Sequence, residues 1–243
     1  MACLLGAIPG CAGGFVVVSL FTHRLLSFGA LIGGMVATFG DEALFMAAQS
    51  PKNALILTGI LFIIGFVAGL SLLKIPTGKL VTSETHDFVL HEEHQHQHVN
   101  SHDRHWKERI IHFFKEHVWE HVIKQHALKL FLYAFGTLII LGVLNHFFDL
   151  QMMMENHLWA KWVLLFIAVG IGFLPVSGPH LIFVMLFLQG SIPFSVLLAN
   201  SIAQNGHAGI PMMAQSKRNF LVMKLTTMVI GLCIGGILLG IGF

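Results

Sequence analysis

Two acidic residues and one histidine stand out because they lie inside long apolar stretches. Asp41 and Glu42 fall about two-thirds of the way along the stretch 27–48, and His207 lies in a run, 162–216, that contains no Asp, Glu, Lys or Arg. A carboxylate at the centre of a bilayer costs roughly 2.5 to 3.5 kcal/mol, so such residues usually serve a pathway or face a partner. Carboxylate oxygen and imidazole nitrogen together suit first-row divalent metal ions.

An internal repeat brings the acid and the imidazole into register. Shifting the sequence by 166 residues pairs 6–55 with 172–221 and gives 15 identities in 50 aligned positions. In this alignment Asp41 is paired with His207, and the glycines just before them are paired as well. Two-fold pseudosymmetry between the copies therefore predicts a carboxylate and an imidazole at matching depth.

Further polar residues of both copies extend the predicted site. Broken helices at membrane depth expose carbonyl oxygens and helix ends, which transporters use to coordinate ions. Proline and glycine predict such breaks at 9–10, 175–179 and 189–193. For His180 the alternative is a hydrogen-bonding role at a helix end. The predicted intramembrane metal ligands are Cys11, Asp41, Glu42, His180, Asn200, Gln204, Asn205 and His207.

The elements that must position these residues are apolar helices. Of the residues, 55% are apolar and 11% are charged, against roughly 25% charged in a soluble domain. A bilayer core about 30 Å thick needs roughly 20 apolar residues per helix. The sequence therefore predicts an all-α polytopic membrane protein with broken helices and about eight spans, three in a partial first repeat (1–73) and five in a second repeat (127–243). The net charge of +2 gives no indication of nucleic-acid binding.

The orientation of the repeats follows from the parity of their spans. Five spans per complete unit is an odd number, so the copies are predicted to form an inverted repeat. The positive-inside rule then places the polar segment 74–126 in the cytoplasm, on the side of Arg24 and Lys224, with Lys52 and Lys161 on the opposite side. An oxyanion cargo would favour Arg or Lys in the membrane core, where this assignment predicts neither.

The polar segment contains 11 of the 16 histidines. Imidazoles interleaved with carboxylates bind divalent metals, so the segment is predicted to collect metal; the alternatives are a solvated linker or a pH-responsive one. Apolar residues at helical spacing over 103–125 predict an amphipathic helix on the membrane surface. The loop residues predicted to capture metal are His91, His94, His96, His98, His102 and His105.

One catalytic motif occurs in the same segment. Residues 117–121, His-Val-Trp-Glu-His, match the inverted zinc-protease pattern His-x-x-Glu-His. A segment so rich in His and Glu gives such a match readily by composition alone. The sequence carries no Gly-rich phosphate loop and no Gly-x-Ser-x-Gly elbow, so we expect a protein that is not an enzyme.

Three runs of residues carry a family resemblance. Gly6-Ala-Ile-Pro-Gly-Cys11, Gly178-Pro-His180 and Asn200-Ser-Ile-Ala-Gln-Asn-Gly-His-Ala-Gly209 resemble the bacterial manganese transporters, a group also described as ten-span heavy-metal or arsenic efflux permeases. The resemblance covers nearly all of the membrane portion. It implies a multi-pass exporter of the bacterial inner membrane with a His-rich cytoplasmic loop. Relative to that family, the first two spans have no counterpart here.

These observations predict a secondary transporter that exports a divalent transition metal. Mn²⁺ is the first candidate, as a transported substrate and not a permanently bound cofactor, because the predicted ligands are mostly oxygen and nitrogen. Arsenite would favour several thiols, whereas only Cys11 lies near the predicted site. The alternatives are a membrane-bound metal sensor or buffer without transport, and an arsenic or other heavy-metal permease. The expected partners are the metal ion and the bilayer, and association of identical chains is left open.

Overall fold

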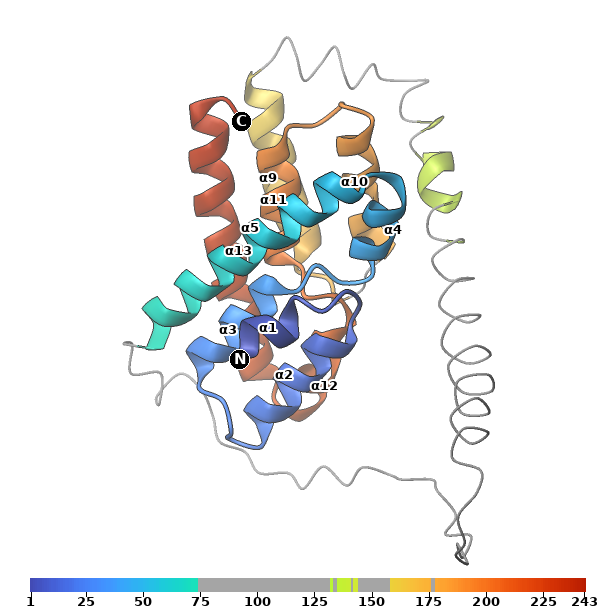
Figure 1. The fold of residues 1–243 in the computed structure, drawn as a ribbon. Helices are drawn as coiled ribbons and strands as arrows, with labels where there is room; N and C mark the ends of the chain where they lie inside the picture. The colour runs from blue at the N-terminus through green and yellow to red at the C-terminus, as the bar shows by residue number, and fades with distance from the viewer. Residues whose placement is uncertain (74–131, 133–134, 141, 144–157, 176–177) are drawn as a thin grey trace, which may run out of the picture.

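The computed structural model describes residues 1–73, 132, 135–140, 142–143, 158–175 and 178–243. All the elements named in these residues are helical, as the sequence predicts (Figure 1). The first part of the chain forms α1 (Ala2–Gly6), α2 (Ala12–Thr22), α3 (Phe28–Ala37), α4 (Glu42–Gln49) and α5 (Pro51–Leu73). The later part forms α9 (Leu158–Gly172), the 3-10 turn η3 (Gly178–His180), α10 (Leu181–Leu188), α11 (Phe194–Ala203), the 3-10 turn η4 (Gly206–Ala208), α12 (Gly209–Gln215) and α13 (Lys217–Ile241).

The helix boundaries repeat with the 166-residue offset of the sequence alignment. Helices α3 and α11 begin and end 166 residues apart, as do the starts of α5 and α13 and the ends of α1 and α9. A ring contact also recurs: the centroids of Phe21 and Phe28 lie 6.3 Å apart, and those of Phe187 and Phe194 lie 5.9 Å apart. The two copies therefore share local structure as well as residues.

The two copies also exchange packing partners. Helix α2 packs against α12, which is the counterpart of α4, and α10, the counterpart of α2, packs against α4. A hydrogen bond of 2.6 Å from Thr22 Oγ1 to Gln215 Oε1 joins α2 to α12. Figure 1 shows α2 and α12 together at the bottom of the view and α4 and α10 together at the upper right. The central helices are α3 and α11, each with nine of its ten residues buried.

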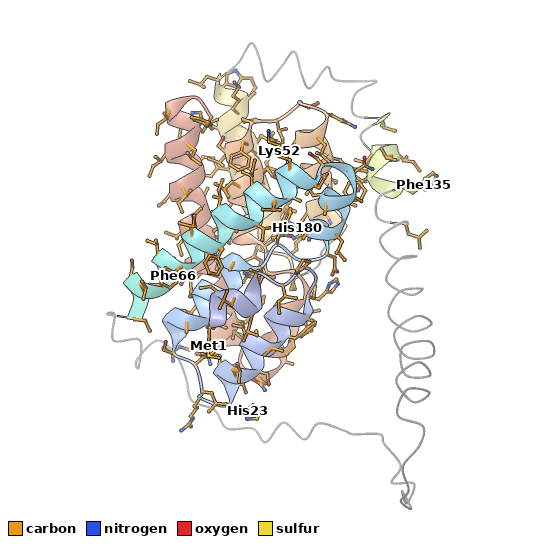
Figure 2. All side chains as sticks on the ribbon, in the orientation of Figure 1. Met1, His23, Lys52, Phe66, Phe135 and His180 are labelled. Carbon is orange, nitrogen blue, oxygen red and sulfur yellow. The ribbon has the colours of Figure 1, made fainter. Side chains whose placement is uncertain are left out.

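Helix lengths correct part of the span assignment. Among the described helices, α5 and α13 are long and apolar enough to cross a membrane, and both expose large apolar side chains such as Phe66 and Ile237 (Figure 2). The stretches 2–23 and 27–48 are each split into two short helices. The break in 2–23 falls at the Pro-Gly pair, as the sequence predicts, whereas the break at 38–41 corrects the continuous span expected over 27–48.

Small residues let neighbouring helices cross at close range in both copies. A Cβ built on Gly65 of α5 would lie 2.5 Å from the carbonyl oxygen of Gly33 on α3. The second copy has the equivalent crossing, where a Cβ on Gly231 of α13 would lie 2.8 Å from the Ala199 oxygen of α11. Close backbone approach at small residues is a main source of helix association in lipid.

This crossing predicts a position-specific effect on stability. We expect Gly65→Ala to lower the free energy of unfolding by about 1 to 3 kcal/mol, because the added methyl group overpacks the crossing and forces α5 away from α3. Gly59 lies on the same helix, and no atom of the described residues lies within 4 Å of its Cβ position, so Gly59→Ala is the matched control. Thermal unfolding in detergent compares the two variants, and equal melting temperatures would contradict a tight crossing.

Candidate metal site

Three interruptions of the helices meet at one place and carry Cys11, Asp41 and His207. Cys11 directly precedes α2, Asp41 directly precedes α4, and His207 lies in η4. The first two interruptions are joined by a hydrogen bond of 3.1 Å from Gly10 N to Gly40 O. Both copies of the repeat therefore contribute to the same site.

The three side chains present three different ligand atoms to one another. One sulfur, one oxygen and one nitrogen all lie within 4.8 Å of each other. The Cys11 thiol donates to Asp41 Oδ1 at 3.6 Å, and its sulfur lies 3.9 Å from His207 Nδ1. His207 Nδ1 lies 3.9 Å from Asp41 Oδ2, with the side chains 34% and 15% exposed, respectively. The structure therefore brings together the acid and imidazole that the repeat paired, and adds the predicted cysteine.

Two glycines turn the chain into this site. Gly40 and Gly206 directly precede Asp41 and His207 and have φ values of +74° and +52°. Glycine adopts this left-handed region readily, whereas other residues pay a steric cost there. A side chain on Gly40 would also meet the Glu42 carboxylate, since its Cβ would lie 2.6 Å from Glu42 Oε2. Both glycines therefore turn the chain directly before a ligand residue, three residues after α3 and α11 have ended.

Three predicted ligands lie deeper than this group. Glu42, Gln204 and Asn205 are at most 1% exposed. The amide nitrogens of Gln204 and Asn205 donate to backbone oxygens of the first copy, Phe39 O at 3.0 Å and Met35 O at 3.4 Å. Among the residues that the structure describes, both carboxylate oxygens of Glu42 and both amide oxygens have no hydrogen-bond partner. Buried acceptors of this kind are costly unless a proton or a cation satisfies them.

His180 and Asn200 form a separate pair. Asn200 Nδ2 donates to Ala168 O at 2.7 Å and lies 3.2 Å from His180 Nδ1. His180 is fully buried and lies in the interior of the molecule (Figure 2), but it is outside the group formed by Cys11, Asp41 and His207. This placement agrees with the hydrogen-bonding alternative for His180.

Lys224 is one of the charged residues to which the positive-inside rule was applied, and its side chain is fully buried within the protein. Its Nζ donates to Gly172 O at 2.9 Å and to Ala203 O at 3.4 Å. One signal was available: Lys224 lies seven and eleven residues before Gly231 and Gly235, which are on the buried face of α13.

The remaining predicted features lie outside the described residues. These are the whole segment 74–126, including the metal-capturing loop, the amphipathic helix 103–125 and the His-x-x-Glu-His match at 117–121. The predicted loop ligands His91, His94, His96, His98, His102 and His105 therefore stay predictions.

The donor set limits what the site can bind. Thiolate, imidazole and carboxylate together suit transition metals, because Mg²⁺ and Ca²⁺ prefer oxygen alone. Three protein ligands leave one or more positions of a divalent ion for water or for other ligands. Such an incomplete shell suits an ion that must enter and leave.

Comparison with known proteins identifies the family of the chain. Residues 1–140 and 134–239 match the ArsP_2 family, described as "Putative, 10TM heavy-metal exporter". Neither the curated proteins nor the solved structures provide a match. The matched residues cover nearly the whole chain, and the resemblance seen in the sequence is confirmed. The chain belongs to the ArsP_2 family of multi-pass membrane proteins, which carries that description.

Proposed function

We propose that this protein is a secondary transporter that exports a divalent transition metal through the site formed by Cys11, Asp41 and His207. The observation that carries the proposal is the convergence of three ligand atoms within 4.8 Å from three separate helix interruptions. A carboxylate in such a position is expensive in a membrane protein unless it serves a pathway. Convergence from both copies is also what a site at a repeat interface requires.

The proposed cargo is Mn²⁺. The group of Cys11, Asp41 and His207 supplies one oxygen and one nitrogen, and the deeper residues Glu42, Gln204 and Asn205 supply further oxygens that have no partner among the described residues. Oxygen-rich sites suit Mn²⁺, whereas the Cys11 thiol favours softer ions such as Zn²⁺ and Cd²⁺. Lys224 does not favour an oxyanion as the cargo, because its ammonium group donates to two backbone carbonyls.

The proposed orientation has the two repeats inverted across the bacterial inner membrane. Reciprocal packing of α2 on α12 and of α10 on α4 supports a two-fold relation between the copies. The polar segment 74–126 would then face the cytoplasm, where its histidines collect metal for the intramembrane site. In export from the cytoplasm, the loop would bind the metal first and the intramembrane site would bind it next.

Metal flux into inverted membrane vesicles tests the proposal directly. We expect vesicles that contain the protein to accumulate Mn²⁺ at least about tenfold faster than vesicles without it. Parallel measurements with Zn²⁺, Cd²⁺, Fe²⁺ and arsenite rank the cargo. Accumulation of none of these ions would contradict transport, and accumulation of arsenite alone would contradict the metal assignment.

A further inference from the structure

Lys224 bridges the ends of two helices in the interior of the molecule. Gly172 and Ala203, whose carbonyl oxygens accept its two hydrogen bonds, are the last residues of α9 and α11. Thr227, one turn further along α13, donates to the same Ala203 oxygen at 3.5 Å. The ammonium group therefore lies where two helix C-termini converge.

The electrostatics of this position match one positive charge. A helix C-terminus carries roughly −0.5 elementary charge, so two converging ends offer about one negative charge. Lysine is almost never fully buried unless it is paired, and within the described part of the chain the Lys224 ammonium group donates to backbone carbonyls. The helix ends thus take the place of an acidic partner.

Helix ends of this kind are cation sites in other transporters. Where helices are interrupted at mid-membrane, their C-terminal ends and unwound carbonyls coordinate a coupling ion. Here the 166-residue offset pairs Lys224 with Thr58 on α5, so the first copy has a short neutral side chain at the same position. The second copy alone therefore carries a covalently attached cation at residue 224.

The bridged helix end is continuous with the proposed metal site. Ala203 directly precedes Gln204 and Asn205, whose amides contact Phe39 O and Met35 O of the first copy. Two residues further on is His207. The position of the α11 end therefore affects where His207 faces Asp41.

We propose that Lys224 is a tethered cation that fills a monovalent-cation position between the ends of α9 and α11 and thereby holds the His207 side of the metal site in place. This inference rests on the proposed function. The tethered ammonium group makes metal transport independent of free Na⁺ or K⁺ at this position. Lys224 is a positioning residue, because it contacts helix ends and not the metal ligands themselves.

Substitution with restoration by small cations tests the proposal. Lys224→Ala removes the ammonium group and leaves space for a small cation, whereas Lys224→Gln removes the charge and keeps a long side chain with a donor. Purified variants in liposomes are assayed for Mn²⁺ flux in choline, Na⁺ or methylammonium chloride. We expect wild-type flux to be equal in all three salts. In choline, flux through Lys224→Ala should be at least tenfold slower than wild-type flux. In Na⁺ or methylammonium, flux through this variant should be at least threefold faster than its own flux in choline. Flux through Lys224→Gln should be slow in every salt.

Thermal unfolding of the same samples separates this inference from the transport proposal. Na⁺ or methylammonium should raise the melting temperature of Lys224→Ala by several degrees relative to choline, with no such shift in the wild type, even if no metal flux were detected. Wild-type flux by Lys224→Gln in choline would overturn the proposal, because a neutral donor would then suffice. A melting temperature of Lys224→Ala that is the same in all three salts would also overturn it, as would wild-type flux that requires Na⁺.

Discussion

Asp41→Asn should lower the rate of Mn²⁺ transport by about 100-fold or more while the protein still reaches the membrane. Asparagine keeps the size of the side chain but removes the negative charge from the group formed with Cys11 and His207. Residues that merely orient a metal ligand typically contribute 10-fold to 100-fold, so loss of a charged ligand should reach at least the upper end. The measurement is the initial rate of Mn²⁺ uptake into inverted vesicles, normalised to the amount of protein.

The partner imidazole provides an independent check on the same site. His207→Ala should cause a comparable loss, because its Nδ1 lies 3.9 Å from Asp41 Oδ2 and is the imidazole nitrogen of the proposed ligand set. His23 is an exposed histidine that follows α2 (Figure 2), so His23→Ala is the matched control and should transport like the wild type. Normal transport by both Asp41→Asn and His207→Ala would remove the site assignment.

The parts of the fold that sequence reasoning anticipated are those that the repeat encodes. One alignment offset predicted that Asp41 would lie opposite His207, and the same offset relates the boundaries of α3 and α11. Proline and glycine at 9–10, 175–179 and 189–193 marked interruptions that the structure contains. These features are local or copied, so a single sequence is enough to reveal them.

The features that sequence reasoning missed depend on contacts between residues that are distant in the sequence. Hydropathy measures the length of an apolar stretch but not where its backbone leaves the helix, so the break at 38–41 was invisible within 27–48. The burial of Lys224 could not be predicted from the sequence, because its partners are backbone carbonyls 52 and 21 residues away. Every residue has a backbone carbonyl, so the residue types do not indicate which carbonyls accept these hydrogen bonds.

A second large effect is expected at Cys11, and it should depend on the metal. Thiolate is a soft ligand that strengthens binding of Zn²⁺ and Cd²⁺ far more than that of Mn²⁺. Serine has a similar shape but offers a hard oxygen. We therefore expect Cys11→Ser to lower Zn²⁺ and Cd²⁺ transport by about tenfold or more and to change Mn²⁺ transport by less than about threefold.

The pattern of loss across metals also separates two roles for the thiol. Serine retains an O–H that can donate to Asp41 Oδ1 as the thiol does at 3.6 Å, so a thiol that only orients the carboxylate would be replaced without loss for any metal. If the thiol binds the transported ion, Cys11→Ser should lose transport of the soft ions Zn²⁺ and Cd²⁺ alone. Cys233 is exposed on α13, and Cys233→Ser controls for the removal of a thiol elsewhere in the chain. Competition between Zn²⁺ and Mn²⁺ in the vesicle assay measures the change in preference, and an unchanged preference in Cys11→Ser would exclude the sulfur as a ligand of the transported ion.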